Sequence, residues 1–154
     1  MIGLGIAIVV AVFFAMEWVA WATHKYVMHG FLWSLHRDHH VRENKGFFEK
    51  NDFFFLIFAL PGSALTIWGW LNPEWNVQFW IGLGITAYGM AYFLVHEIFI
   101  HQRFRWFRKT NHPYFRAIKD AHHAHHKHIG KEHGECFGML WAPREFFRAA
   151  FAKG

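Results

Sequence analysis

Three long apolar runs constrain the fold of this chain more than any other feature of its sequence. They cover residues 2–23, 53–71 and 77–95. At 1.5 Å per residue, each run is long enough to cross most or all of a hydrocarbon layer of about 30 Å as an α-helix. Glu17 puts a charge inside the first run, Asn51 and Asp52 can cap the second, and residues 72–76 leave room only for a tight turn before the third. The sequence therefore predicts an all-α integral membrane helical bundle with about three transmembrane helices, forming a single domain.

The composition favours lipid rather than water as the solvent. Hydrophobic residues make up 54% of the 154 residues and aromatic residues 21%, and a soluble domain of this size has too little interior to bury so much apolar surface. The net charge of +5 would suggest nucleic acid in a soluble protein. Here the basic residues flank apolar runs, so we expect contact with lipid headgroups and no nucleic acid. Cys136 is the only cysteine, which excludes an internal disulfide framework and a self-contained iron–sulfur cluster on cysteine ligands.

The basic residues predict how the bundle is oriented. All 16 Lys and Arg lie either between the first two runs or after the third, and all 14 histidines lie within residues 24–50 or 96–136. With three spans these segments share one side, and the positive-inside rule makes that side cytoplasmic and the N-terminus external. We therefore expect a multi-pass protein with its active site on the cytoplasmic side. We expect residues 137–151 to form a helix that lies in the membrane interface, with a re-entrant segment as the alternative.

Ten of the histidines form four clusters with a repeated spacing. An H-x4-H pair ends the first run, another ends the third, and an H-x-x-H-H triplet follows each pair. The ten are His24, His29, His36, His39, His40, His96, His101, His122, His125 and His126. On an α-helix, positions i, i+3 and i+4 lie within an arc of roughly 100°, so each triplet is expected to aim three imidazoles at one point. Positions i and i+5 are about 140° apart on a straight helix, so each pair reaches either two metals or one metal across a local distortion.

The repeated order predicts a site for two metal ions, since three or four nitrogens per metal would use this set of histidines. Imidazole suits iron, zinc, copper and nickel, so the ligand type does not choose the metal. The carboxylates Asp38, Glu97 and Asp120 lie beside the clusters and are candidates to orient the ligating imidazoles, with ordinary solvated charge as the alternative. The remaining histidines fall outside the pattern and are expected to be structural; they are His112, His123, His128 and His133.

Glu17 is unusual because carboxylates inside a membrane are costly and usually functional. It precedes His24 by seven residues, so the two share a helix face to within about 20°. Tyr92 lies one turn before His96 and shares that face. Together with Tyr88, Glu17 and Tyr92 are candidates to line a substrate channel near the metals; a neutral acid bonded to a neighbouring helix is the alternative for Glu17. The channel walls would include Phe13, Phe14 and Trp18.

The order of the four histidine clusters resembles that of the membrane-bound fatty acid hydroxylase superfamily. Other stretches are similar to those of bacterial β-carotene 3-hydroxylases: they are His24-Lys-Tyr-Val-Met-His29-Gly30, Lys45-Gly-Phe-Phe-Glu49-x-Asn51-Asp52, Thr86-Ala-Tyr-Gly89, His101-Gln-Arg103 and Phe137-Gly-x-Leu-x-Ala-Pro143. The resemblance runs from about Glu17 to Pro143. It departs in the last cluster, where His123 fills a variable position and extra histidines follow.

The resemblance implies a non-haem di-iron centre held by the ten histidines, with molecular oxygen as co-substrate. It also implies hydroxylation of the β-ionone rings of carotenoids at carbon 3, which converts β-carotene to zeaxanthin. Zinc competes well for imidazole and can substitute for iron in the isolated protein. A hydroxylase or desaturase of the same superfamily acting on fatty acids or sterols is the alternative, and a metal transporter or sensor is a weaker one.

A monooxygenase consumes two electrons, and this sequence has neither a flavin motif nor cysteine ligands to supply them. The resemblance therefore implies an external electron donor such as ferredoxin. A group of basic residues after the third run would attract an acidic partner, although these residues serve equally well to set topology. The group comprises Arg103, Arg105, Arg108 and Lys109.

Overall fold

A computed structural model of the chain describes residues 2–41, 46–104, 106, 110–130 and 136–152. Helices with three short π-helical or 3-10 segments make up its regular structure. In chain order they are α1 (Ile2–Ala22), η1 (Thr23–Phe31), α2 (Trp33–His40), α3 (Asp52–Leu71), η2 (Pro73–Trp75), α4 (Asn76–Tyr92), η3 (Phe93–Ile100), α5 (Pro113–His126) and α6 (Arg144–Ala152). The prediction of an all-α membrane bundle is confirmed.

Three of these helical stretches are long and apolar enough to cross a membrane: Ile2–Phe31, Asp52–Leu71 and Asn76–Ile100. The first and third are longer than the runs predicted at 2–23 and 77–95, because the π-helical turns η1 and η3 continue α1 and α4. Large apolar side chains are exposed along all three stretches, as expected for helices whose outer faces contact lipid.

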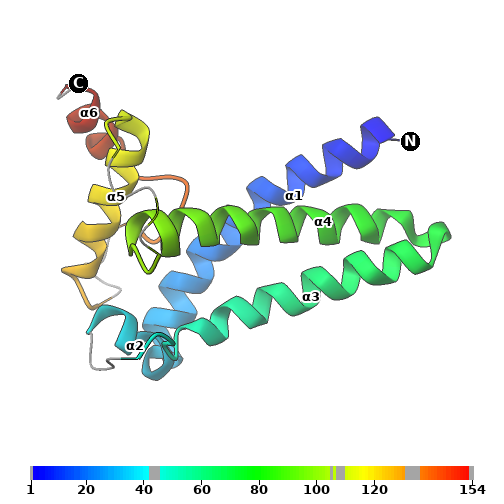
Figure 1. Cartoon of the computed structure of the whole chain (residues 1–154), viewed down its shortest axis with the longest axis horizontal. Helices are drawn as coiled ribbons and strands as arrows, with labels where there is room; N and C mark the ends of the chain where they lie inside the picture. Colours follow the sequence, from blue (N-terminus) through cyan, green and yellow to red (C-terminus); the bar gives the residue numbers. More distant parts are fainter. Residues whose placement is uncertain (1, 42–45, 105, 107–109, 131–135, 153–154) are drawn as a thin grey trace.

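Helices α3 and α4 form a hairpin, and α1 packs against α4 (Figure 1). Small residues allow the hairpin helices to approach closely. A Cβ atom at Gly69 would lie 2.3 Å from the backbone nitrogen of Phe79, and one at Gly82 would lie 2.5 Å from the backbone nitrogen of Thr66. Close helix contact through glycine is typical of membrane bundles, where backbone approach replaces the hydrophobic effect as the source of packing energy.

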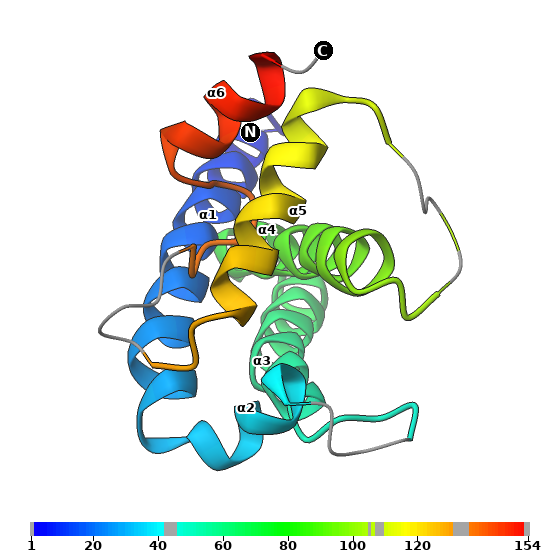
Figure 2. The same ribbon diagram turned by 90° about the vertical axis from the view of Figure 1, so that its left-hand side faces the viewer.

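The remaining helices gather at one end of the bundle, opposite the turn between α3 and α4 (Figure 1). There α5 lies across the end of the bundle between α1 and α4 (Figure 2). Helix α6 packs on α5, with the Arg116 guanidinium donating to the carbonyl oxygen of Ala150 at 2.7 Å. With nine residues, Arg144–Ala152 is too short to span a bilayer. A small core of Phe99, Ile118, Met139 and their neighbours joins η3, α5 and the segment before α6.

Candidate metal centre

The π-helical turns explain the H-x4-H spacing. A π-helix joins residues five apart by hydrogen bonds, so positions i and i+5 come to lie near one another. In η3 the amide of His101 donates to the carbonyl oxygen of His96 at 2.9 Å. The ring centroids of His96 and His101 are 4.4 Å apart, and those of His24 and His29 in η1 are 5.1 Å apart. Of the two arrangements considered for these pairs, the structure has the local distortion that brings both imidazoles to one place.

Nine of the ten predicted histidines form two groups, and within each group the ligand atoms lie within 4.8 Å of one another. Cluster 1 consists of His24, His29, His36, His40 and His125. Cluster 2 consists of His39, His96, His101 and His122. His126 lies beside cluster 2, since its Nε2 atom is 2.9 Å from that of His122. The helices α2 and α5 and the turns η1 and η3 supply nine of the ten imidazoles, and His101 follows directly after η3.

Each H-x-x-H-H triplet divides between the two clusters, contrary to the expectation that its three imidazoles meet at one point. In α2, His36 and His40 belong to cluster 1 and His39 to cluster 2; α5 has the reverse arrangement, with His125 alone in cluster 1. The reason is helical geometry: positions i and i+4 are only about 40° apart, whereas i+3 lies about 60° away on the other side of i. One helix can therefore contribute ligands to two neighbouring centres. Cluster 1 receives His125 from the second half of the sequence, and cluster 2 receives His39 from the first half.

Three imidazoles of cluster 1 are held by neutral oxygen atoms. Nδ1 of His24 donates to the Phe137 carbonyl at 3.0 Å, and Nδ1 of His29 donates to the Ile129 carbonyl at 2.8 Å. Nδ1 of His36 donates to Oδ1 of Asn51 at 2.7 Å. Because an oxygen of this kind only accepts, each Nδ1 carries the proton and each Nε2 presents a lone pair. Asn51 thus positions a histidine and makes no side-chain cap for α3, contrary to expectation.

Two imidazoles of cluster 2 are held by carboxylates instead. Nδ1 of His39 lies 2.9 Å from Oε2 of Glu49, and Nδ1 of His96 lies 2.5 Å from Oε1 of Glu97. Pairing of this kind is typical of metal-binding histidines, since it fixes the tautomer and the ring orientation.

The donor set fits metal ions. The Nε2 atoms of His24 and His36 are 3.0 Å apart, although both carry lone pairs in the tautomers that their Nδ1 partners require. Two lone pairs at this distance repel one another, and a cation between them removes the repulsion. Nε2 of His39 is buried and has no hydrogen-bond partner among the described residues. Imidazole nitrogens gathered in this way suit divalent transition metals.

Burial keeps these imidazoles in the neutral form that binds metal. It lowers the pKa of His36 to about 3 and that of His126 to about 4. Burial, together with repulsion from His101 and His96, holds the pKa of His39 well below its ordinary value. The site is therefore ready to bind metal at neutral pH without first releasing protons from these rings.

Arg103 joins three carboxylates beside cluster 2. Its Nη1 atom lies 2.8 Å from Asp52 and 3.1 Å from Glu97, and its Nη2 atom lies 3.3 Å from Glu49. Burial alone would lower the pKa of Arg103, but the hydrogen bond to Asp52 and the charges of Glu97 and Glu49 raise it. In the structure, the guanidinium is thus engaged within the protein rather than free for a partner. Three other basic residues of the predicted group lie outside the described residues: Arg105, Arg108 and Lys109.

The other predicted residues lie as follows. Glu97 contacts His96, whereas Asp38 is buried and accepts a hydrogen bond from the amide of Lys50 at 2.7 Å, and Asp120 is exposed on α5. Three of the remaining histidines are exposed and lie outside the two clusters: His112, His123 and His128. His133 lies outside the described residues.

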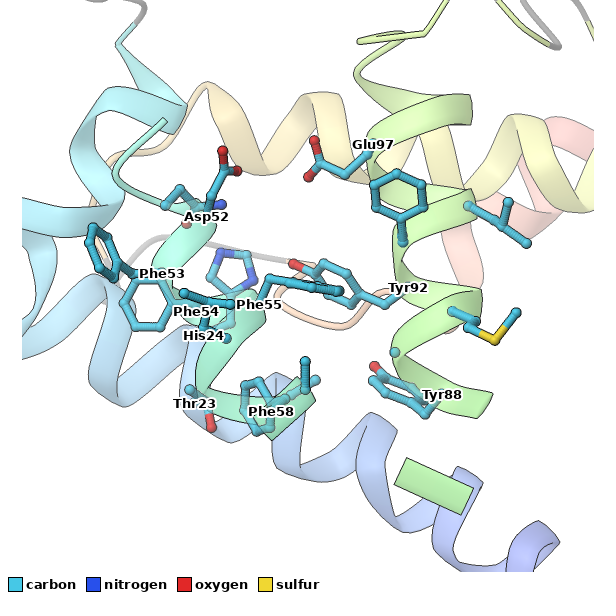
Figure 3. A pocket seen from close by; sticks show the side chains of 18 of the residues that line it. Thr23, His24, Asp52, Phe53, Phe54, Phe55, Phe58, Tyr88, Tyr92 and Glu97 are labelled. Atoms are coloured by element: carbon cyan, nitrogen blue, oxygen red, sulfur yellow. The ribbon is translucent and has the colours of Figure 1, made fainter. Parts of the chain in front are cut away.

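A cavity of about 810 Å³ lies between α1, α3 and the α4–η3 helix and reaches His24 of cluster 1 (Figure 3). Most of its lining is apolar, with His24 in the inner wall. Asp52 and Glu97 face each other at one end, and Tyr92 extends across the cavity toward His24 (Figure 3). Tyr88 also lines this cavity. A second cavity of about 520 Å³ adjoins a different face of α1 and includes three predicted channel residues, Phe14, Glu17 and Trp18. The ring of Phe13 packs edge-on against Tyr88 at 5.5 Å.

Comparison with known sequences identifies the family. The sequence profile of the fatty acid hydroxylase family matches residues 9–142. This chain belongs to the fatty acid hydroxylase family.

Several relatives of this hydroxylase carry a more specific name. It is 39% identical over 139 residues to the beta-carotene hydroxylase of Paracoccus sp. (strain PC1), covering 88% of this chain and 83% of the relative. It is 42% identical over 137 residues to the beta-carotene hydroxylase of Pseudescherichia vulneris, covering 88% of this chain and 75% of the relative. It is 38% identical over 130 residues to the chloroplastic beta-carotene 3-hydroxylase 2 of Arabidopsis thaliana, covering 83% of this chain and 42% of the relative. No solved structure gives a significant match.

In this hydroxylase, Glu17 anchors the segment that precedes α6. Its Oε1 atom accepts hydrogen bonds from the backbone amides of residues 139–141 at 2.9, 2.9 and 3.1 Å. Its Oε2 atom accepts one from the Tyr88 hydroxyl at 2.7 Å. The carboxyl group of Glu17 therefore accepts hydrogen bonds from three backbone amides and one hydroxyl. A Cβ atom at Gly138 would lie 2.9 Å from Oε1, so the absence of a side chain there permits the contact.

Replacing Glu17 with leucine should destabilise the hydroxylase by roughly 2–5 kcal/mol, because donors within the protein lose their shared acceptor. Glu17→Gln is the matched control, since its amide oxygen still accepts hydrogen bonds from the same amides. The measurement is thermal unfolding of the detergent-solubilised variants. Equal stability of Glu17→Leu and the parent protein would show that this anchor contributes nothing to the fold.

Proposed function

We propose that this chain hydroxylates the β-ionone rings of carotenoids at carbon 3, converting β-carotene to zeaxanthin with a di-iron centre and molecular oxygen. The observation that carries the proposal is an apolar cavity lined by His24 of cluster 1 and by Tyr92, which packs against His96 of cluster 2. The chain that forms it is 39% and 42% identical to bacterial beta-carotene hydroxylases. Iron bound there would supply, with oxygen, the oxidising power for an inert C–H bond that amino-acid side chains lack.

The residues of the chain would hold and orient the reactants. The histidines of clusters 1 and 2, with His126, would hold the two ions through their Nε2 atoms. For five of these histidines, a hydrogen-bond partner on Nδ1 keeps the ring in the required tautomer. Tyr92 stacks near His96 with ring centroids 4.9 Å apart, so a substrate ring that reaches Tyr92 and His24 lies next to both clusters. Apolar walls around that ring exclude water from the reacting carbon.

The substrate would enter the cavity from the bilayer. Some of the cavity lining belongs to the exposed apolar surface of α3 and α4–η3; these residues are Phe55, Leu56, Met90 and Leu94. A side opening between two membrane helices suits a long apolar polyene that is dissolved in lipid. The electrons would come from an external donor such as ferredoxin, because this sequence carries no redox cofactor motif of its own.

Expression in cells that accumulate β-carotene tests the proposed reaction. Zeaxanthin and its mono-hydroxylated precursor should form only when oxygen is present. The family description keeps fatty acids as the alternative substrate class, with sterols beside them. If β-carotene stays unchanged while fatty acids or sterols gain a hydroxyl group, the carotenoid assignment is wrong.

We also propose that the histidine clusters face the cytoplasm and that the N-terminus is external, because the basic residues lie on the histidine side. Topology reporters fused after Asn76 should then read as external, and reporters fused after Gly130 or at Gly154 as cytoplasmic. A cytoplasmic signal at Asn76 would reverse the proposed orientation.

A further inference from the structure

The two histidine clusters differ in the charge of the groups behind their imidazoles. In cluster 1, the three Nδ1 atoms with described partners donate to neutral oxygens, two backbone carbonyls and the Asn51 amide. In cluster 2, the two corresponding partners are the carboxylates of Glu49 and Glu97. The sequence pattern gives no sign of this difference, since the two halves repeat the same histidine spacing.

A carboxylate on Nδ1 makes an imidazole a stronger donor than a neutral oxygen does. The negative charge draws the Nδ1 proton toward itself and raises the electron density at Nε2, which binds the metal. The charge also attracts the cation directly, and within a protein such attraction is much less screened than in water. Both effects favour a metal ion in cluster 2 over one in cluster 1.

Arg103 and Asp52 hold these carboxylates in place. Glu49 and Glu97 come from different parts of the chain, yet both contact the guanidinium of Arg103, at 3.3 and 3.1 Å. Asp52 accepts from Arg103 at 2.8 Å and from the backbone amide of Glu49 at 3.0 Å. Three carboxylates surround one guanidinium, so the group as a whole carries a net negative charge beside cluster 2.

We infer that the two metal positions are unequal, and that cluster 2 is the high-affinity position because Glu49 and Glu97 strengthen its imidazoles. The inference rests on the proposed two-metal centre. Metal therefore enters cluster 2 first and leaves it last. Arg103 is a positioning residue, which acts on the metal through the two carboxylates.

Metal titration of the full chain tests this order without any measurement of activity. Apoprotein in detergent is titrated with Zn²⁺ in competition with a chromophoric chelator, and metal per chain is counted independently. Two dissociation constants are expected, separated by roughly tenfold or more, the scale on which partners of ligating histidines alter metal affinity. Two equal constants would overturn the inference but leave the two-metal proposal intact. Uptake of fewer than two ions per chain would overturn both.

Two opposite substitutions assign the constants to the clusters. Glu97→Gln should weaken the tighter constant by roughly tenfold or more and leave the weaker one unchanged. Asn51→Asp places a carboxylate of nearly the same shape 2.7 Å from Nδ1 of His36, so it should tighten the weaker constant. A gain in affinity cannot come from misfolding, which keeps the test decisive if Glu97→Gln proves unstable.

Glu74→Gln is the charge-matched control, since Glu74 is exposed in the turn at the opposite end of the bundle. It should change neither constant. The inference is wrong if Glu97→Gln weakens only the weaker constant, or if Asn51→Asp leaves both constants as they were.

Discussion

Alanine in place of a clustered histidine should abolish hydroxylation and lower the metal content while leaving membrane insertion intact. The residues with the largest expected effect are His36, His39, His96, His122, His125 and His126. Each presents its ring among the other imidazoles in the described structure, and loss of one donor leaves the remaining nitrogens without the geometry that holds the metal. The measurements are product formed in cells that accumulate β-carotene, metal per purified chain, and the amount of protein in the membrane fraction.

His112→Ala and His128→Ala are the matched controls. Both histidines are exposed and lie outside the two clusters, so these variants should keep most of the activity and the full metal content. Equal damage from the clustered and the exposed positions would mean that the histidines act through the fold and not as ligands.

Gly89→Trp should block the cavity and reduce β-carotene hydroxylation by roughly tenfold or more, since a small displacement of the reacting atom costs a large part of the rate. Gly89 lines the cavity, and a Cβ atom placed there meets no other atom within 4 Å. The indole ring would therefore extend into space that the substrate needs, without a clash in the helix packing. Metal content should stay unchanged, because neither cluster is touched.

Gly3→Trp is the control for the added ring. Gly3 is also open at its Cβ position, but it lies near the start of α1 and away from the cavity lining. If Gly89→Trp is as active as Gly3→Trp, the substrate does not use this cavity.

The long helices and the histidines could be predicted because each rests on a local pattern. An apolar run of sufficient length predicts a span whatever it packs against. The repeated spacing of imidazoles predicts metal binding before any helix is placed. The resemblance based on these motifs is confirmed by the match to the fatty acid hydroxylase family over residues 9–142.

The division of the histidines between two clusters could not be predicted in the same way. An α-helical wheel places His24 and His29 far apart, and only the π-helical turn of η1 brings them together. The choice between α- and π-turns depends on tertiary contacts, since a π-helical turn is rare by itself. The distribution of the His36, His39 and His40 triplet likewise depends on where the other helices place their imidazoles.

Most of the groups that hold the histidines could not be predicted from a local pattern. Asn51 stands where a helix cap is expected, and Glu49 lies in a loop. Both belong to a stretch that resembles the family, but the resemblance gave neither of them a role. Arg103 was predicted either to attract an acidic partner or to set the topology, yet it pairs with carboxylates from two segments. For Glu17, sequence position indicated an important role, but its amide partners lie more than a hundred residues away. Each of these contacts is set by the packing of distant segments.

Oxygen-isotope labelling of the product tests the central claim most directly. Purified protein loaded with iron, a competent reductant and β-carotene in lipid vesicles should be supplied with ¹⁸O₂ in ordinary water. We expect zeaxanthin and its mono-hydroxylated precursor with ¹⁸O in the hydroxyl group at carbon 3. Hydroxyl oxygen derived from water, or no oxidation of β-carotene despite full metal loading and an active reductant, would contradict it.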